Sequence, residues 1–265
     1  MKYNVSVCLV STNELYVLKN CLNSIVGNEV YSYKIEIIIV DNCSNDGTED
    51  YIKNCKFNLP LKYIKNKKKL SFAANNNIAM QNAEGEYYLI LNPDTIIIES
   101  AIGKMKEYLD NNNEIACIAP KLLYEDHSFQ VNCRKFPKAS YLLGSRLNSL
   151  NIGFFSKSNK EYQLVNPSIK KPLEVDWVLG ACMLIRANVI DKVGGFDERF
   201  IYYFEDTDLC WRMKSFGWKV CYLPSAEVIH LYRRKAAKSL INKKAFLQLY
   251  TISLFYLKNY YKILS

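Results

Sequence analysis

The sequence predicts an α/β fold in which helices flank a mostly parallel central sheet. Short, β-branched, nearly continuous apolar runs at 5–10 (VSVCLV) and 35–40 (IEIIIV) are typical of strands buried on both faces of such a sheet. Between these runs, apolar residues recur at helical spacing, at Leu15, Leu18, Leu22 and Ile25. Parallel strands need a crossover of this kind, so strand, helix, strand is the expected start of the fold.

The alternation of strand and helix signals continues to residue 120. We expect strands at 61–64, 87–91 and 115–119, and helices between them at about 73–83 and 99–111. Each helix again lies between two apolar runs, as a repeated crossover requires. The first 120 residues are therefore expected to repeat the β-α-β unit of a mostly parallel sheet.

The pattern breaks after residue 120. The short polar pieces of 121–172, with three prolines, predict an excursion with little regular structure. Order returns at 177–186 (WVLGACMLIR). Beyond that run the spacing predicts the remaining elements: a helix at 206–216, strands at 218–223 and 226–230, and a last helix at about 240–262.

Composition narrows the class of protein. The 265 residues are 49% hydrophobic and 23% charged, which is the balance of a globular chain. No apolar run reaches the ~18 residues of a membrane span, and the start of the chain lacks a signal-peptide pattern. Nine cysteines without a C-x-x-C pair argue against zinc ribbons and disulfide frameworks and suit a reducing cytosol. We therefore expect a cytoplasmic protein.

The net charge of +9 is concentrated in the C-terminal tail. Residues 228–265 contain eight Lys and Arg and no acidic residue. Such a tail is expected to bind phosphate groups, on nucleic acid, on lipid headgroups or on a phosphorylated ligand. For the helix at 240–262 two interpretations stay open: it packs on the body, or it lies on an anionic membrane surface. The neutral body and the lack of any known module pattern argue against nucleic-acid binding, so no nucleic-acid partner is expected.

Polar residues follow several of the predicted strands. Neither a dinucleotide-binding glycine motif nor a P-loop is present, which removes the main support for those two functions. Ligands of open α/β sheets bind at the carboxyl ends of the strands. The residues found there are Ser11, Thr12 and Glu14 after the first strand, Asp41 after the second, Asn92 and Asp94 after YYLIL, and His230 after the last.

Each acidic or imidazole group at this edge has a structural and a functional interpretation. Asp41 either forms an Asx-turn at the start of the polar loop or accepts a hydrogen bond from a base or a ribose. Asp94 is either a helix cap or a ligand for a hard cation such as Mg²⁺ or Mn²⁺. His230 is either structural or a second ligand, and imidazole beside carboxylate suits Mn²⁺ better than Mg²⁺.

Three acids lie together at the start of the helix predicted at 206–216: Glu205, Asp206 and Asp208. Acids are stabilised at this position by the helix dipole, by about 0.3–1 kcal/mol each. Three acids directly after the aromatic cluster of Phe200, Tyr202, Tyr203 and Phe204 are more than the helix dipole requires. One of them is therefore a candidate general base whose pKa is tuned by its surroundings.

Taken together, these segments resemble an inverting glycosyltransferase of the family-2 type with the GT-A fold. The resemblance spans roughly residues 4–232 and rests on these phrases: VSVCLVSTNELYVLKNCLNSI, VDNCSNDGT, FAANNNIA, LNPDT, VDWVLGACMLIRANVIDKVGGFDERF and YYFEDTDLCWRMKSFGWKVCYLPSAEVIH. The phrases NNNIA, RKFP, VDW, GFDERF and EDTDLCWR resemble bacterial O-antigen and cell-wall rhamnosyltransferases within the family.

The resemblance implies a role for each matching residue. It makes Asp206 the catalytic base and Asp94 and His230 the ligands of Mn²⁺ or Mg²⁺. Asn92 stands where the first D-x-D acid is expected, so Asp94 is left as the carboxylate ligand. Donor binding is implied for Ser11, Thr12, Glu14, Asp41, Phe72, Asn76, Asn77, Asn92 and Asp94. The acceptor side is implied to comprise Trp177, Gly180, Ala181, Glu205 and Asp208.

The resemblance also implies substrates and organisation. The donor would be a nucleotide sugar, most specifically dTDP-L-rhamnose, with a UDP-hexose as the alternative. The acceptor would be a saccharide on a polyprenyl diphosphate, reached from the cytoplasmic face of the membrane. A domain at 1–232 would divide into a donor-binding half (1–120) and an acceptor half (121–232), followed by the basic helix of 233–265.

Overall fold

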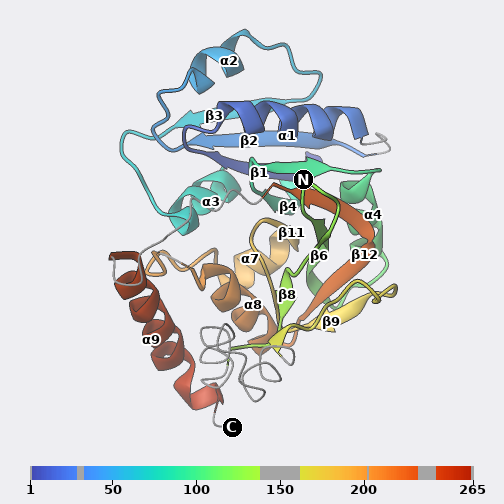
Figure 1. Cartoon of the computed structure of the whole chain (residues 1–265), viewed down its shortest axis with the longest axis vertical. Coiled ribbons are helices and arrows are strands. Elements are labelled where there is room, and N and C mark those ends of the chain that lie inside the picture. Colours follow the sequence, from blue (N-terminus) through green and yellow to red (C-terminus); the bar gives the residue numbers. More distant parts are fainter. Residues whose placement is uncertain (1, 29–32, 138–161, 202, 232–242, 264–265) are drawn as a thin grey trace.

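The computed structural model describes residues 2–28, 33–137, 162–201, 203–231 and 243–263 (Figure 1). Among them, strands form a mixed sheet with the order β3-β2-β1-β4-β11-β6-β12-β5. The first four strands in the chain are parallel neighbours: β1 (Tyr3–Ser11), β2 (Ile35–Asp41), β3 (Leu61–Lys65) and β4 (Gly85–Leu91). Helices α1 (Leu15–Asn28), α2 (Thr48–Asn54) and α3 (Phe72–Gln81) connect them. The parallel pairing expected for these four strands is confirmed, whereas the strand expected at 115–119 pairs with none of them.

The second half of the sheet is built from more distant segments. Strand β11 (Cys182–Arg186) lies antiparallel between β4 and β6 (Ile115–Leu123). Strand β12 (Lys219–His230) runs parallel to β6 and antiparallel to the short β5 (Thr95–Ile97). The remaining elements are α4 (Ala101–Asp110), α7 (Ala187–Val193), α8 (Glu205–Ser215), β7 (Phe129–Gln130), β8 (Cys133–Arg134), β9 (Leu173–Val175) and β10 (Trp177–Val178).

Two apolar layers cover the two faces of the sheet. On β1, Val5, Val7 and Leu9 belong to the layer formed with α1 and α4, whereas Cys8 faces the layer formed with α3, α7 and α8. Alternation along the strand sends successive side chains to opposite faces, and both faces are buried here. This is why the strand sequences are continuously apolar instead of alternating.

Several sequence expectations needed correction. Helix α2 and strand β5 were not predicted, because both are short. The segments 218–223 and 226–230 form one strand, β12, with a register shift between Leu223 and Glu227. Pro224 lies in that shift, where the missing N–H is tolerated. The supposed excursion contains β7 and β8, and its residues 138–161 lie outside the described part.

The C-terminal helix α9 (Lys243–Ile263) packs against α8. Phe255 is fully buried, and its ring lies 5.9 Å from that of Trp211 and 5.5 Å from that of Phe204. Lys258 Nζ lies 2.7 Å from a carboxylate oxygen of Asp197 and 2.7 Å from one of Asp208. Its described part therefore supports the packing interpretation. Lys258 is not available for headgroups, and the cations at 233–238 lie outside the described residues.

The described helices include none that is long and apolar enough to cross a bilayer. The expected domain boundary at residue 232 falls in 232–242, which is also outside the described residues. The division of the chain at that point stays a prediction.

Candidate functional site

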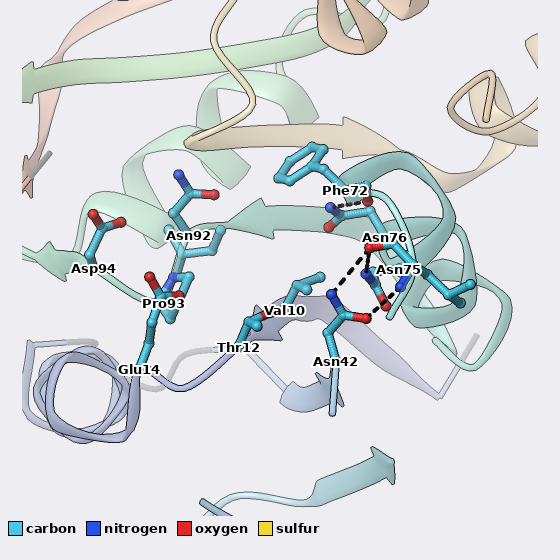
Figure 2. Close-up of a pocket in the computed structure, with 12 residues that line it drawn as sticks. Val10, Thr12, Glu14, Asn42, Phe72, Asn75, Asn76, Asn92, Pro93 and Asp94 are labelled. Carbon is cyan, nitrogen blue, oxygen red and sulfur yellow. Dashed lines mark hydrogen bonds between the residues drawn. The ribbon is translucent and has the colours of Figure 1, made fainter. Parts of the chain in front are cut away.

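A cleft opens at the carboxyl ends of β1, β2 and β4 (Figure 2). Asn92 and Asp94 lie at one end of it, and Asn42, Asn75 and Asn76 lie at the other. The parallel strands end at the same edge, so residues far apart in the chain meet there. Its full lining is Val10, Thr12, Glu14, Asn42, Leu70, Phe72, Asn75, Asn76, Leu91, Asn92, Pro93 and Asp94.

The loop after β1 is held by the loop after β2. The backbone N–H of Asn13 donates to Ser44 Oγ at 3.0 Å, and the N–H of Leu15 donates to Asp46 Oδ2 at 2.8 Å. These bonds fix the positions of Thr12 and Glu14 in the cleft wall. They also explain why the polar sequence NCSND follows β2, since each loop supplies partners for the other.

Asp41 lies at the base of the same loop. It is fully buried, and its Oδ1 accepts the N–H of Ser44 at 2.7 Å while its Oδ2 accepts the hydroxyl of Tyr63. Burial and this carboxylate raise the pKa of Tyr63. Asp41 thus orders the turn, and Asn42, not Asp41, lines the cleft. Ser11 is likewise buried behind the cleft wall. Contact of Asp41 and Ser11 with a nucleotide stays a prediction.

Two asparagines that sequence reasoning did not select, Asn42 and Asn75, line the cleft. Asn42 Oδ1 accepts the N–H of Leu70 at 2.8 Å, and Asn75 Oδ1 accepts Asn66 Nδ2 at 2.6 Å. Asn75 Nδ2 also donates to the carbonyl of Ser71 at 2.8 Å. These amides hold the segment 66–71 at the cleft edge. The sequence signal that could have identified them is their position next to Asp41 and Asn76, which the sequence did point to.

Helix α3 distributes the other predicted donor residues between two sides. Phe72 and Asn76 line the cleft, and Asn76 Nδ2 donates to the carbonyl of Phe72 at 3.0 Å. Asn77 is turned away from the cleft. Its Nδ2 donates to the Phe196 carbonyl and to Glu198 Oε1, both at 2.9 Å, and its Oδ1 accepts the N–H of Phe196 at 2.8 Å. The structure does not bring Asn77 to the donor cleft.

Asp94 and His230 meet at the end of the cleft. Pairing of β12 with β5 sets His230 opposite Thr95, and its Nε2 lies 3.4 Å from Asp94 Oδ1. Asn92 Nδ2 also lies 3.4 Å from that Nε2, and His230 Nδ1 lies 2.8 Å from Gln130 Oε1. The described residues form no cluster of three or more His, Cys, Asp and Glu. One carboxylate and one imidazole fit a cation that takes its other ligands from substrate phosphates and water.

Asp206 lies at the first turn of α8, 8% exposed. Its Oδ2 accepts the N–H of Gly180 at 3.1 Å, and its Oδ1 accepts the N–H of Thr207 at 2.7 Å. Burial raises the pKa of the Asp206 carboxyl, while these two N–H groups and the charge of Arg134 oppose the rise. A carboxylate with a raised pKa is a better proton acceptor near neutral pH.

Gly180 connects Asp206 with the cleft. A Cβ atom on this residue would lie 3.2 Å from Phe72 Cζ and 3.7 Å from Asp206 Cβ. Phe72 lines the cleft, so Gly180 lies between a residue of the cleft wall and Asp206. Tyr203 and Phe204 enter α8 with φ of +67° and +73°, a costly conformation for aromatic residues. The chain thus reaches Asp206 through a strained turn.

The neighbouring acids have different surroundings from Asp206. Glu205 Oε2 is buried without a hydrogen-bond partner among the described residues, and burial together with the charge of Asp206 raises the pKa of Glu205 to about 8. Asp208 is ion-paired with Arg212, at 2.8 Å, and with Lys258. Glu205 is therefore mostly neutral at pH 7, and the charge of Asp208 is engaged. Asp206 is the acid of the three that accepts the N–H of Gly180, beside the cleft.

The other predicted acceptor-side residues, Trp177 and Ala181, lie close to Gly180 in the sequence. Trp177 Nε1 donates to the carbonyl of Lys135 at 2.8 Å, and the Arg134 guanidinium lies 5.2 Å from the Trp177 ring. The carbonyl of Ala181 accepts the N–H of Asn92 at 2.9 Å. The latter bond ties the start of β11 to the end of β4. Ala181 therefore holds the segment just before β11 beside Asn92, which follows β4.

Comparison with known proteins gives one family and consistent relatives. The profile of "Glycosyl transferase family 2" matches residues 6–165. The N-acetylglucosaminyl-diphospho-decaprenol L-rhamnosyltransferase of Mycobacterium tuberculosis is 28% identical over 207 residues, 74% of this chain and 66% of that protein. Rhamnosyltransferase WbbL of Escherichia coli is 31% identical over 169 residues, 60% of each chain. This chain thus spans less than two thirds of the length of either relative.

A solved structure shares the fold. GalNAc-T7, determined with UDP, GalNAc and Mn²⁺, matches with a TM-score of 0.66 at 17% identity. The match covers 88% of this chain and 44% of that one. At this identity the match shows a shared fold.

Proposed function

Because the chain belongs to glycosyltransferase family 2 and has the GT-A fold, we propose that it transfers a sugar from a nucleotide donor to an acceptor hydroxyl with inversion. One observation carries the proposal. Asp94 lines the cleft and lies next to His230, and Gly180 lies between Asp206 and Phe72, which lines the same cleft. The proposed cation ligands and the proposed base would thus lie around one binding space, which is what a single displacement of a diphosphate requires.

The donor occupies the cleft in this proposal. Thr12, Glu14, Phe72 and Asn76 would contact it, with Asp41 and Ser11 supporting the nucleotide end from behind. Asp94 and His230 would hold Mn²⁺ or Mg²⁺, and the cation would supply charge neutralisation for the departing diphosphate. The cleft wall meanwhile fixes the orientation of the sugar toward the acceptor.

Asp206 removes the proton from the acceptor hydroxyl as its oxygen bonds to C1 of the sugar. The bond from C1 to the diphosphate oxygen breaks on the opposite face, so the anomeric configuration inverts. Gly180 and Thr207 hold the two carboxylate oxygens by backbone N–H groups, which orients the base. Protonated Glu205 beside it adds no second negative charge near neutral pH.

The proposed donor is dTDP-L-rhamnose and the product an α-L-rhamnoside. The names of the two relatives support rhamnose, and one of them names a diphospho-decaprenol acceptor. We extend this to a polyprenyl-diphosphate-linked saccharide of a bacterial cell-envelope polysaccharide. Peripheral binding at the cytoplasmic membrane surface would bring the enzyme to that acceptor. Tyr250 and Leu257, 46% and 77% exposed on α9, would face the lipid.

A donor panel tests the proposal. The protein is incubated with dTDP-L-rhamnose, UDP-glucose, UDP-N-acetylglucosamine or GDP-mannose, and release of the nucleoside diphosphate is measured with Mn²⁺ and with EDTA. We expect metal-dependent release from dTDP-L-rhamnose, and its loss in Asp206→Asn when acceptor is present. Turnover of a UDP-hexose alone would replace the donor assignment and keep the family mechanism. Equal turnover with EDTA would refute the metal site.

A further inference from the structure

Gln130 contacts the imidazole of His230 from the side away from the cleft. Both side chains are buried, with 3% and 4% exposed, and Gln130 Oε1 lies 2.8 Å from His230 Nδ1. Strand β7 pairs Gln130 with Leu122 of β6, and β6 pairs Leu122 with Val228 of β12. Three adjacent strands therefore define this contact. Neither the proposed donor contacts nor the proposed base makes use of Gln130.

The two amide partners of His230 favour one tautomer of the ring. A carbonyl oxygen only accepts, so the contact with Gln130 Oε1 requires the proton on Nδ1. An amide nitrogen only donates, so Asn92 Nδ2, 3.4 Å from Nε2, requires a lone pair there. The two contacts lie on opposite ring nitrogens and agree with each other. With the two amides oriented as in the structure, these contacts place the proton on Nδ1 and the lone pair on Nε2.

In this tautomer Nε2 is ready to bind a cation. Asp94 Oδ1 lies 3.4 Å from it, so two electron-pair donors lie close enough to share one cation. The opposite tautomer would aim an N–H at the cation site and would have to lose that proton before binding. Histidine ligands in metal sites are commonly held by an acceptor on the second nitrogen, which fixes the ring and raises its basicity.

We propose that Gln130 is a positioning residue that fixes His230 in the Nδ1-protonated tautomer, so that Nε2 can ligate a divalent cation. The inference rests on the metal site of the proposed function. Removing such a partner generally weakens metal affinity by about 10–100-fold. Gln130→Leu should therefore weaken Mn²⁺ binding by that factor. Gln130→Glu keeps an acceptor oxygen and should stay near the affinity of the unmodified protein.

Metal affinity is measured without turnover. The signal of free Mn²⁺ in electron paramagnetic resonance reports binding to the full chain in the presence of dTDP. The matched control is Asn132→Leu, which removes a buried amide two residues away in the same segment. Asn132 Nδ2 donates to the carbonyl of Pro120 at 2.8 Å and no bond joins it to His230. This control should lower stability and leave the Mn²⁺ affinity unchanged.

The tautomer itself can be observed by ¹⁵N NMR of histidine-labelled, metal-free protein. The chain has two histidines, and exposed His127 serves as an internal reference. At pH 8 we expect His230 to show a protonated Nδ1 and an unprotonated Nε2. Gln130→Leu should shift it toward a mixture of tautomers. This spectrum of the unmodified protein and of Gln130→Glu tests the inference even if Gln130→Leu does not fold.

The outcomes separate the inference from its premise. If His230→Ala weakens Mn²⁺ binding but Gln130→Leu does not, Gln130 has no positioning role and only this inference fails. If neither substitution weakens binding, the metal site of the proposed function fails with it. A proton on Nε2 in the unmodified protein would also overturn the inference, because the Gln130 amide would then be the donor.

Discussion

The substitution Glu205→Gln should make the protein more stable at high pH. The pKa of Glu205 is raised from 4.5 to about 8 in the folded state, with burial as the first cause and the charge of Asp206 as the second. A raised carboxyl pKa means that the folded state binds this proton more tightly than the unfolded chain does. Folding stability is therefore lost as pH rises from 4.5 to about 8, and no further loss follows above that range.

The size of the effect follows from the shift. One pKa unit corresponds to about 1.4 kcal/mol, so a shift of this size amounts to at most about 5 kcal/mol. Sharing of one proton with Asp206 and relaxation around the charge reduce the measurable part to about 2–4 kcal/mol. Glutamine has the shape of the neutral carboxyl and does not ionise. The variant should thus equal the unmodified protein near pH 4.5 and exceed its stability at pH 8.5.

Urea unfolding followed by circular dichroism at pH 5, 6.5, 7.5 and 8.5 measures this difference. The matched control is Glu125→Gln, the same chemical change on an exposed turn, where the difference should not vary with pH. A difference between Glu205→Gln and the unmodified protein that is constant from pH 5 to 8.5 would refute the reasoning. It would show that Glu205 ionises in the folded state as it does in the unfolded chain.

Four further substitutions or conditions give distinct outcomes. Asp206→Asn should bind dTDP and Mn²⁺ normally and lose several orders of magnitude in transfer, on the order of 10²–10⁴-fold; near-normal rates would move the base to Glu205 or Asp208. Asp94→Ala should abolish transfer and weaken Mn²⁺ binding measured with dTDP, and unchanged Mn²⁺ affinity would remove Asp94 from the site. Lys258→Met leaves buried Asp208 with Arg212 as its remaining ion-pair partner, and it should lower the free energy of unfolding in urea by about 2–3 kcal/mol. Leu257→Ala, at a position 77% exposed on the same helix, should lower it by under about 0.5 kcal/mol. Equal losses would contradict the packing of α9. The protein should sediment with vesicles that contain anionic lipid and should be released from them at high salt. The double substitution Tyr250→Glu and Leu257→Glu should weaken this vesicle binding. Binding that neither salt nor these substitutions affect would contradict membrane contact through α9.

The family and the class of fold were accessible from the sequence. Continuous apolar runs mark strands buried on both faces, and VDNCSN and LNPD mark where two of those strands end. The resemblance to family 2 drawn from these phrases is confirmed by the family profile. The meeting of Thr12, Glu14 and Asp94 in one cleft follows from their places after strands, because parallel strands end at a common edge, whereas Phe72 was implied by the resemblance alone.

The individual side chains of the site depended on contacts between distant segments. Asn76 and Asn77 are neighbours in one motif, yet Asn76 lines the cleft and Asn77 bonds to Phe196 and Glu198. Successive residues of a helix point about 100° apart, and a motif does not state which of them faces a ligand. Only the packing of α3 against the segment after α7 separates the two.

Local periodicity and composition established the alternation of strands and helices, the polar residues at the strand ends and the basic tail. Tertiary packing determined the antiparallel insertion of β11, the anchoring of α9 through Lys258, the contrast among Glu205, Asp206 and Asp208, and the contact of Gln130 with His230. The physical reason is the range of the interactions. Backbone propensity and hydrophobic period act over a few residues. Burial, pKa values and the tautomer of an imidazole depend instead on groups that the fold brings together, and Gln130 and His230 are 100 residues apart in the chain.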